Sequence, residues 1–279
     1  MHNTKLCLAA HYGNIDVNEQ IKLYSDAGFY GFFTEYNQNL AQYRNTAEKC
    51  GMYYQSVHAP YVRMCYLWRD CADTEDTRNE LLKCIDDSAD AGVPIVVAHS
   101  YIGIGAKKID VPNEYGISNF SYAVERAVKR GVKIAFENTE GEEFLEMLMT
   151  HFKDVPNVGF CWDTGHEMCY NHSEDMMALY GTRLIATHLN DNLGIRDYNG
   201  EITFHDDLHL LPFDGIADWN NIASRLKKYG YSGELTFELN LGSKPGRHEN
   251  DKYRRLPFEE YISEAYARAC RVAALYAKG

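Results

Sequence analysis

Short runs rich in β-forming residues alternate with longer amphipathic segments from one end of this sequence to the other. The expected strands are residues 5–10, 30–35, 52–59, 94–100, 132–138, 158–164, 184–190 and 233–240. The expected helices between them include residues 18–28, 77–92, 119–131, 141–150 and 219–230, and four of these five end in Gly, the usual residue of a left-handed C-cap. Strands that alternate regularly with helices predict a parallel sheet.

Eight strand–helix units within 279 residues favour a closed (β/α)8 barrel, an α/β fold, over an open doubly wound sheet. No glycine fingerprint follows the first strand, which argues against a dinucleotide-binding fold. No linker or repeat divides the chain, so we expect one domain over residues 1–279. Two loops, residues 190–218 and 242–259, are longer than a barrel needs, and both follow strands on the face where barrel active sites lie.

Composition narrows the classes of partner. With 40 acidic and 28 basic residues the chain carries a net charge of −12, which disfavours nucleic acids and anionic membranes and suits a small-molecule substrate. The eight cysteines form no C-x-x-C pair, so we expect reduced thiols and, with no signal-peptide core or membrane-length apolar run, a cytoplasmic protein. The 21 tyrosines are equally compatible with a homo-oligomer interface and with a monomer surface.

Polar side chains end seven of the eight expected strands. These residues are Glu35, His58, His99, Glu137, Asp163, His188 and Glu238. Side chains two positions apart in a strand point the same way, and small side chains stand two positions before six of these ends: Ser56, Val97, Ala135, Cys161, Ala186 and Thr236. This pattern predicts a crowded polar site above a layer of small side chains at the barrel mouth. Glu35, which has Phe33 in that position, fits the pattern less well.

Convergence of Glu137, Asp163 and Glu238 would create an electrostatic problem. Each close pair of carboxylates repels by about 4 kcal/mol at an effective dielectric constant near 20. A bound cation is the simplest way to neutralise them. With His188 as a neutral fourth ligand, the mixed nitrogen and oxygen set suits Mn²⁺, Zn²⁺, Co²⁺ or Mg²⁺.

Seven segments in this order resemble the xylose isomerase-like TIM barrel superfamily. They are SVHAPY (56–61), VVAHS (96–100), IAFENTEG (134–141), VGFCWDTGH (158–166), ATHLNDN (186–192), DDLHLLPFDGIADW (206–219) and LTFEL (235–239). This superfamily includes sugar and sugar-phosphate isomerases and epimerases, together with the AP endonucleases of family 2.

The resemblance implies specific site residues. The isomerase and epimerase quartet of metal ligands maps onto Glu137, Asp163, His188 and Glu238, and the two glutamates would also move protons. The endonuclease branch binds three metals through additional ligands. The matching positions here are His58, His99, His166, Asp207 and His209. We therefore expect one divalent ion and as many as three.

Charge separates the two enzyme classes. Three carboxylates with one divalent ion leave about −1, which suits a neutral sugar, whereas four carboxylates with three ions leave about +2, which attracts a phosphate. The acidic chain shows no basic surface that would enter a nucleic-acid groove, so we favour a metal-dependent sugar or sugar-phosphate isomerase or epimerase. The alternatives are a multi-zinc phosphodiesterase similar to AP endonuclease family 2 and a non-catalytic metal- or sugar-binding barrel.

Four further residues are candidates for substrate binding. His11 follows the first strand, while Asn190 and Asp191 follow the seventh, where their side chains would reach substrate hydroxyls. Arg247 lies in the locally basic stretch KPGRHENDKYRR (244–255), which would attract an anionic group on the substrate. For each of the four, an ordinary surface or loop role is the competing interpretation.

Overall fold

The computed structural model describes residues 4–102, 110–196 and 204–278. Eight parallel strands form one sheet in the order β7-β6-β5-β4-β3-β2-β1-β8. The strands are β1 (Leu6–Ala9), β2 (Gly31–Glu35), β3 (Tyr53–His58), β4 (Ile95–His99), β5 (Lys133–Glu137), β6 (Val158–Asp163), β7 (Leu184–His188) and β8 (Leu235–Phe237). Neighbours in the chain are neighbours in the sheet, and β1 pairs with β8, as a barrel requires.

The last seam, between β7 and β8, is closed by a few contacts rather than by a long ladder. The N–H of Leu189 donates to the carbonyl of Thr236 at 2.8 Å, and the N–H of Glu238 donates to the carbonyl of Leu189 at 3.2 Å. The Thr187 hydroxyl substitutes for a ladder partner, accepting the N–H of Thr236 at 3.0 Å. These bonds close the sheet and confirm the expected (β/α)8 barrel.

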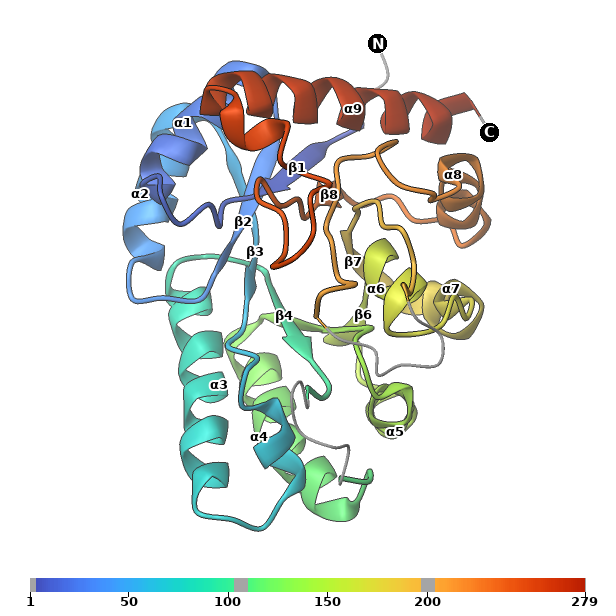
Figure 1. Cartoon of the computed structure of the whole chain (residues 1–279). Helices are drawn as coiled ribbons and strands as arrows, with labels where there is room; N and C mark the ends of the chain where they lie inside the picture. Colours follow the sequence, from blue (N-terminus) through green and yellow to red (C-terminus); the bar gives the residue numbers. More distant parts are fainter. Residues whose placement is uncertain (1–3, 103–109, 197–203, 279) are drawn as a thin grey trace.

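Helices surround the strands, with α9 lying beside α1 and α8 (Figure 1). The α-helices are α1 (Val17–Ala27), α2 (Leu40–Cys50), α3 (Asp73–Asp90), α4 (Glu114–Arg130), α5 (Glu142–His151), α6 (Thr164–Cys169), α7 (Met176–Tyr180), α8 (Trp219–Lys228) and α9 (Phe258–Lys278). Three short 3₁₀ segments are η1 (Met64–Trp68), η2 (Gly181–Arg183) and η3 (Tyr253–Arg255). Gly28 and Gly131 end α1 and α4 at φ of 102° and 71°, which confirms two of the predicted C-caps.

The core has two parts. Most buried apolar side chains pack between the strands and the surrounding helices. A small second cluster inside the barrel contains Ile95, Val97, Ala135, Cys161 and Ala186. Four of these five belong to the predicted layer of small side chains, which leaves room above it for larger polar groups. Among the described residues, no helix combines the length and apolar character needed to cross a bilayer.

Candidate metal centre

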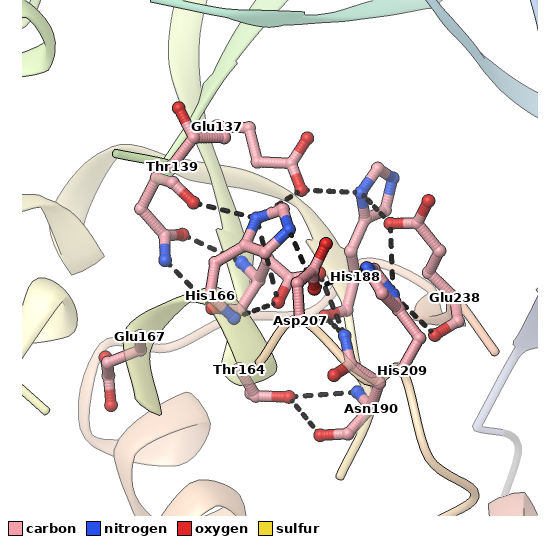
Figure 2. A network of polar contacts seen from close by, with 12 residues as sticks. Glu137, Thr139, Thr164, His166, Glu167, His188, Asn190, Asp207, His209 and Glu238 are labelled. Carbon is pink, nitrogen blue, oxygen red and sulfur yellow. Dashed lines mark hydrogen bonds and ion pairs between the residues drawn. The ribbon is translucent and has the colours of Figure 1, made fainter. Parts of the chain in front are cut away.

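The four residues predicted as a quartet converge at the C-terminal ends of four adjacent strands. Glu137, Asp163 and His188 are the last residues of β5, β6 and β7, and Glu238 follows β8. Each offers a ligand atom, and the four atoms lie within 4.8 Å of one another. His188 Nδ1 is 3.0 Å from a carboxylate oxygen of Glu137 and 3.0 Å from one of Glu238 (Figure 2).

A pair of histidines extends this cluster on the side of β3 and β4. Nε2 of His58 and Nε2 of His99 lie 3.2 Å and 3.3 Å from the same oxygen of Glu137, and 3.2 Å from each other. Two imidazole nitrogens and a carboxylate oxygen this close need a shared proton or a cation between them. His58, His99 and Glu137 are all buried and form a second group able to hold a metal.

A third group forms on the opposite side, where α6 begins. Asp163, His166 and His209 offer ligand atoms within 4.8 Å of one another. Asp207 joins them, since one of its oxygens lies 2.8 Å from His209 Nε2 and 3.5 Å from His166 Nε2. The structure therefore brings all nine predicted ligand positions into one connected cluster.

Hydrogen bonds to backbone carbonyls orient three of the histidines. Nδ1 of His58, His166 and His209 donates to the carbonyl oxygens of Ala59, Asn138 and Glu238 at 2.8, 3.0 and 3.2 Å. Each imidazole therefore turns Nε2 toward the carboxylates. Metal-ligating histidines commonly donate their other ring N–H in this way, so the donor set and its orientation both fit a divalent cation.

Burial and charge shift the ionisation of the cluster strongly. Burial raises the pKa of Asp163 to about 6 and lowers the pKa of His99 to about 4. Burial also opposes charge on His209, but Asp207 and Glu238 outweigh it and raise its pKa to about 9. Burial likewise disfavours ionisation of Glu137, yet the surrounding imidazoles hold its pKa well below the usual range. The carboxylates thus attract positive charge, from protons or from a metal.

A cavity of about 220 Å³ opens above the cluster. Besides candidate ligands, it is lined by Glu35, Tyr61, Ile102, Tyr170, Phe204 and Lys244. Lys244, whose Nζ is 3.8 Å from an oxygen of Asp207, is a functional candidate that the sequence indicated only as part of a basic stretch. Asn138 was not predicted as a site residue. Its side-chain oxygen accepts the backbone N–H of Asp163 at 2.8 Å, and its side-chain NH₂ donates to the carbonyl of Asp163 at 2.9 Å.

The four predicted substrate contacts are dispersed. His11 lines a neighbouring cavity, with its Nε2 donating to the carbonyl of Leu239 at 2.9 Å. Asn190 is completely buried and donates to a carboxylate oxygen of Asp163 at 2.9 Å, so it orients a candidate ligand. Asn190 does not line the central cavity, so the structure gives it a role in orienting Asp163, and its contact with substrate hydroxyls stays a prediction.

Asp191 and Arg247 do not line the central cavity either. The carboxylate of Asp191 accepts backbone N–H groups of Phe213 and Ala217 at 2.8 and 2.9 Å and holds the loop before α8. Arg247 is largely buried and pairs with Asp206 at 3.1 Å and Glu249 at 2.6 Å. Carboxylates of the loops after β7 and β8 thus already pair with Arg247, and its attraction of an anionic substrate group stays a prediction.

Comparison with known proteins agrees with this architecture. The sequence family described as "Xylose isomerase-like TIM barrel" matches residues 20–257. The uncharacterized protein y4fM of Sinorhizobium fredii is 32% identical over 207 residues, which cover 68% of this chain and 63% of the relative. The chain thus spans less than two thirds of the length of the curated relatives it matches.

Two solved structures illustrate the similarity of fold. The IOLI protein with a binding zinc atom superimposes with a TM-score of 0.73 at 18% identity, over 98% of each chain. D-psicose 3-epimerase in the presence of D-fructose gives a TM-score of 0.72 at 13% identity, over 98% of this chain and 99% of that one. Identities this low establish the fold and no activity. Together with the family match over most of its length, they show that this chain belongs to the xylose isomerase-like TIM barrel family.

Proposed function

We propose that the protein is a divalent-metal-dependent isomerase or epimerase of a sugar or sugar derivative. The observation that carries the proposal is the quartet of Glu137, Asp163, His188 and Glu238, whose ligand atoms lie within 4.8 Å of one another beneath a small cavity. Mn²⁺, Zn²⁺, Co²⁺ and Mg²⁺ suit this donor set. When bound, such an ion polarises a substrate carbonyl or hydroxyl and stabilises the negative charge that develops on oxygen.

The two glutamates have different access to a substrate. Glu238 lines the cavity and its side chain is 14% exposed, so its carboxylate can take a proton from the carbon beside a carbonyl and return it. Glu137 is completely buried behind imidazoles and does not line the cavity. We therefore propose Glu238 as the proton carrier and Glu137 as a ligand, in place of the paired roles that the resemblance implied.

This division bears on the type of reaction. Isomerisation moves a proton between adjacent carbons on one face of a sugar and needs one base. Epimerisation removes a proton from one face and returns one to the opposite face, so it needs two. Among the described residues, the other carboxylates that line the cavity are Glu35 and Asp207, so we propose that an epimerase would draw its second proton carrier from them.

The test is metal-dependent proton exchange on ketoses in D₂O, followed by NMR. We expect exchange beside the carbonyl with the metal-loaded protein, its loss after chelation, and a loss of at least about a thousandfold in Glu238→Gln. Glu35→Gln tests a candidate second proton carrier, because it removes a cavity-lining carboxylate outside the quartet, whereas Glu259→Gln, at an exposed position at the start of α9, is the control that should leave exchange unchanged. Exchange that persists in Glu238→Gln would show that another group moves the proton.

A multi-metal phosphodiesterase is the second candidate. The assembly of all nine ligand positions, including the His58–His99 pair and the group around His166, favours it. The net charge of −12 and the presence of only one lysine or arginine, Lys244, among the described cavity-lining residues oppose it. Three zinc ions per chain together with nicking of abasic DNA would establish this class, and bound metal without turnover of either substrate would identify a binding protein.

A further inference from the structure

Glu35 is the strand-end carboxylate that belongs to none of the candidate metal groups. It ends β2, is exposed, and lines the central cavity of about 220 Å³. It also lines two adjoining cavities of about 450 and 600 Å³. Within the described part of the chain its carboxylate has no hydrogen-bond or ion-pair partner. Glu35 is thus a lining residue that all three cavities share, and we call the cavities of about 450 and 600 Å³ the smaller and the larger branch.

The larger branch begins beside the proposed proton carrier. His11 lines this branch, and its Nδ1 lies 3.9 Å from an oxygen of Glu238. The backbone N–H of Asn240, another lining residue, donates to the carbonyl of His209 at 2.9 Å. The larger branch therefore lies close to Glu238, within the reach of a substituent on a sugar that reacts there.

The chemistry of the larger branch suits a neutral group with many hydroxyls. Asn14, Asn240 and Arg254 line it, and among the described residues their side chains have no hydrogen-bond or ion-pair partner. The two amides both donate and accept hydrogen bonds, Arg254 donates, and Glu35 accepts. Since one guanidinium is balanced by one carboxylate, a phosphate or a sugar acid would meet Glu35 as well as Arg254.

The smaller branch offers fewer hydrogen-bonding groups to a substituent with many hydroxyls. Among its described lining residues the one arginine, Arg63, is already paired with Glu80 at 3.0 Å, and Pro60 and Val62 form part of the apolar lining. The central cavity, at about 220 Å³, lies below the roughly 300–1,000 Å³ of pockets that enclose drug-sized ligands, so it takes one small ring. Space for a second ring is therefore in the larger branch.

We propose that the larger branch is a second sugar subsite, and that the preferred substrate carries a neutral glycosyl group on the sugar that reacts at the metal. This proposal rests on the proposed function for the identity of the reacting sugar. Arg254 and Asn240 are the specificity-determining residues of the subsite, and neither belongs to the metal cluster.

The experiment compares kcat/KM for D-fructose with kcat/KM for turanose, maltulose and isomaltulose, which are glucosyl-fructoses of different linkage. We expect at least one disaccharide to be preferred by about tenfold or more. Arg254→Ala lowers that preference about tenfold, because it removes a charged donor, whereas Arg255→Ala, an exposed arginine next in the chain that does not line the branch, leaves the preference unchanged. Equal use of fructose and all three disaccharides would overturn the proposal.

A second variant and a binding measurement separate this proposal from the proposed function. Gly13 lines the branch and a Cβ there meets nothing within 4 Å, so Gly13→Leu should fold and narrow the subsite. If no ketose turns over, the proposed function fails, and calorimetric titration of the same four sugars still tests the subsite. Tighter binding of a disaccharide that is weakened in both variants supports it, and affinities that are equal for all four sugars or unchanged in both variants refute it.

Discussion

Asp191 follows His188 by three residues, yet its carboxylate serves the loop rather than the cavity. Besides three backbone N–H groups, it accepts the indole N–H of Trp219 at 2.9 Å, and its side chain is fully buried. The same residue pairs with Leu210 through two backbone bonds of 2.9 Å. It thus fixes the segment that carries Asp207 and His209 over the barrel mouth.

Replacing the carboxylate of Asp191 by an amide should destabilise the folded protein. Asp191→Asn keeps one acceptor and turns an NH₂ group toward N–H donors, so we expect a loss of about 3 kcal/mol in the free energy of unfolding. Asp218→Asn is the matched control, because Asp218 caps α8 from an exposed position and Asn caps equally well. Urea unfolding measures the free energy of unfolding of both variants, and equal losses of stability would contradict the role given to Asp191.

Proton binding at the histidines should make the stability of the metal-free protein depend on pH. The folded-state pKa of His209 is about 9, above its unfolded value near 6.5. Its contribution to stability is therefore fully present below pH 6.5 and is lost as the pH rises through 9. The raised pKa values of His58 and His166 act in the same direction. We expect the melting temperature of the metal-free protein to fall between pH 6.5 and 9, and a constant or rising value would contradict this.

At the scale of elements, strand ends were more predictable than the segments that follow them. The expected strand over 132–138 is β5, and its polar end Glu137 lies where the alternation of side chains placed it. Helix α6 was not expected, because six residues are too few to show a helical period. Its cap explains its position: the carboxylate of Asp163 accepts the N–H of His166 at 2.6 Å.

Packing is also tight at the start of α6. A Cβ on Gly165 would lie 1.9 Å from the side-chain oxygen of Asn190, which itself holds Asp163. We expect Gly165→Ala to cost about 1–3 kcal/mol of stability and to weaken metal binding, since Asn190 must move. In Gly242→Ala the new Cβ meets nothing within 4 Å, so this control should be nearly neutral. Thermal unfolding with and without metal compares them, and equal effects would refute the packing argument.

For the whole molecule, the alternating pattern was sufficient to predict the barrel, and residue type at the strand ends was sufficient to gather the ligands. The orientations of Asp191 and Arg247 were not predictable, because they depend on donors and carboxylates in loops whose path the sequence does not encode locally. The exposure of the ligands could not be predicted either: Glu137 and Glu238 both lie at the ends of barrel strands, yet Glu137 is completely buried and Glu238 lines the cavity. Such differences arise from packing between distant segments.

Metal removal should affect the stability of the whole barrel, since the ligands come from four strands. A divalent ion at a hundredfold of its Kd stabilises a protein by about 2.7 kcal/mol, which corresponds to a rise of about 5–10 °C in Tm for a chain of this size. We expect chelation to reverse this rise and His188→Ala to abolish most of it. Differential scanning calorimetry measures both, and a Tm insensitive to Mn²⁺, Zn²⁺, Co²⁺ and Mg²⁺ would contradict a metal shared by the strands.

The most direct test of the metal centre is an anomalous-scattering map of crystals grown with Mn²⁺ or Zn²⁺. We expect a peak within roughly 2.0–2.3 Å of ligand atoms from Glu137, Asp163, His188 and Glu238. A map with no peak among these four side chains, or with ions bound only elsewhere, would contradict it.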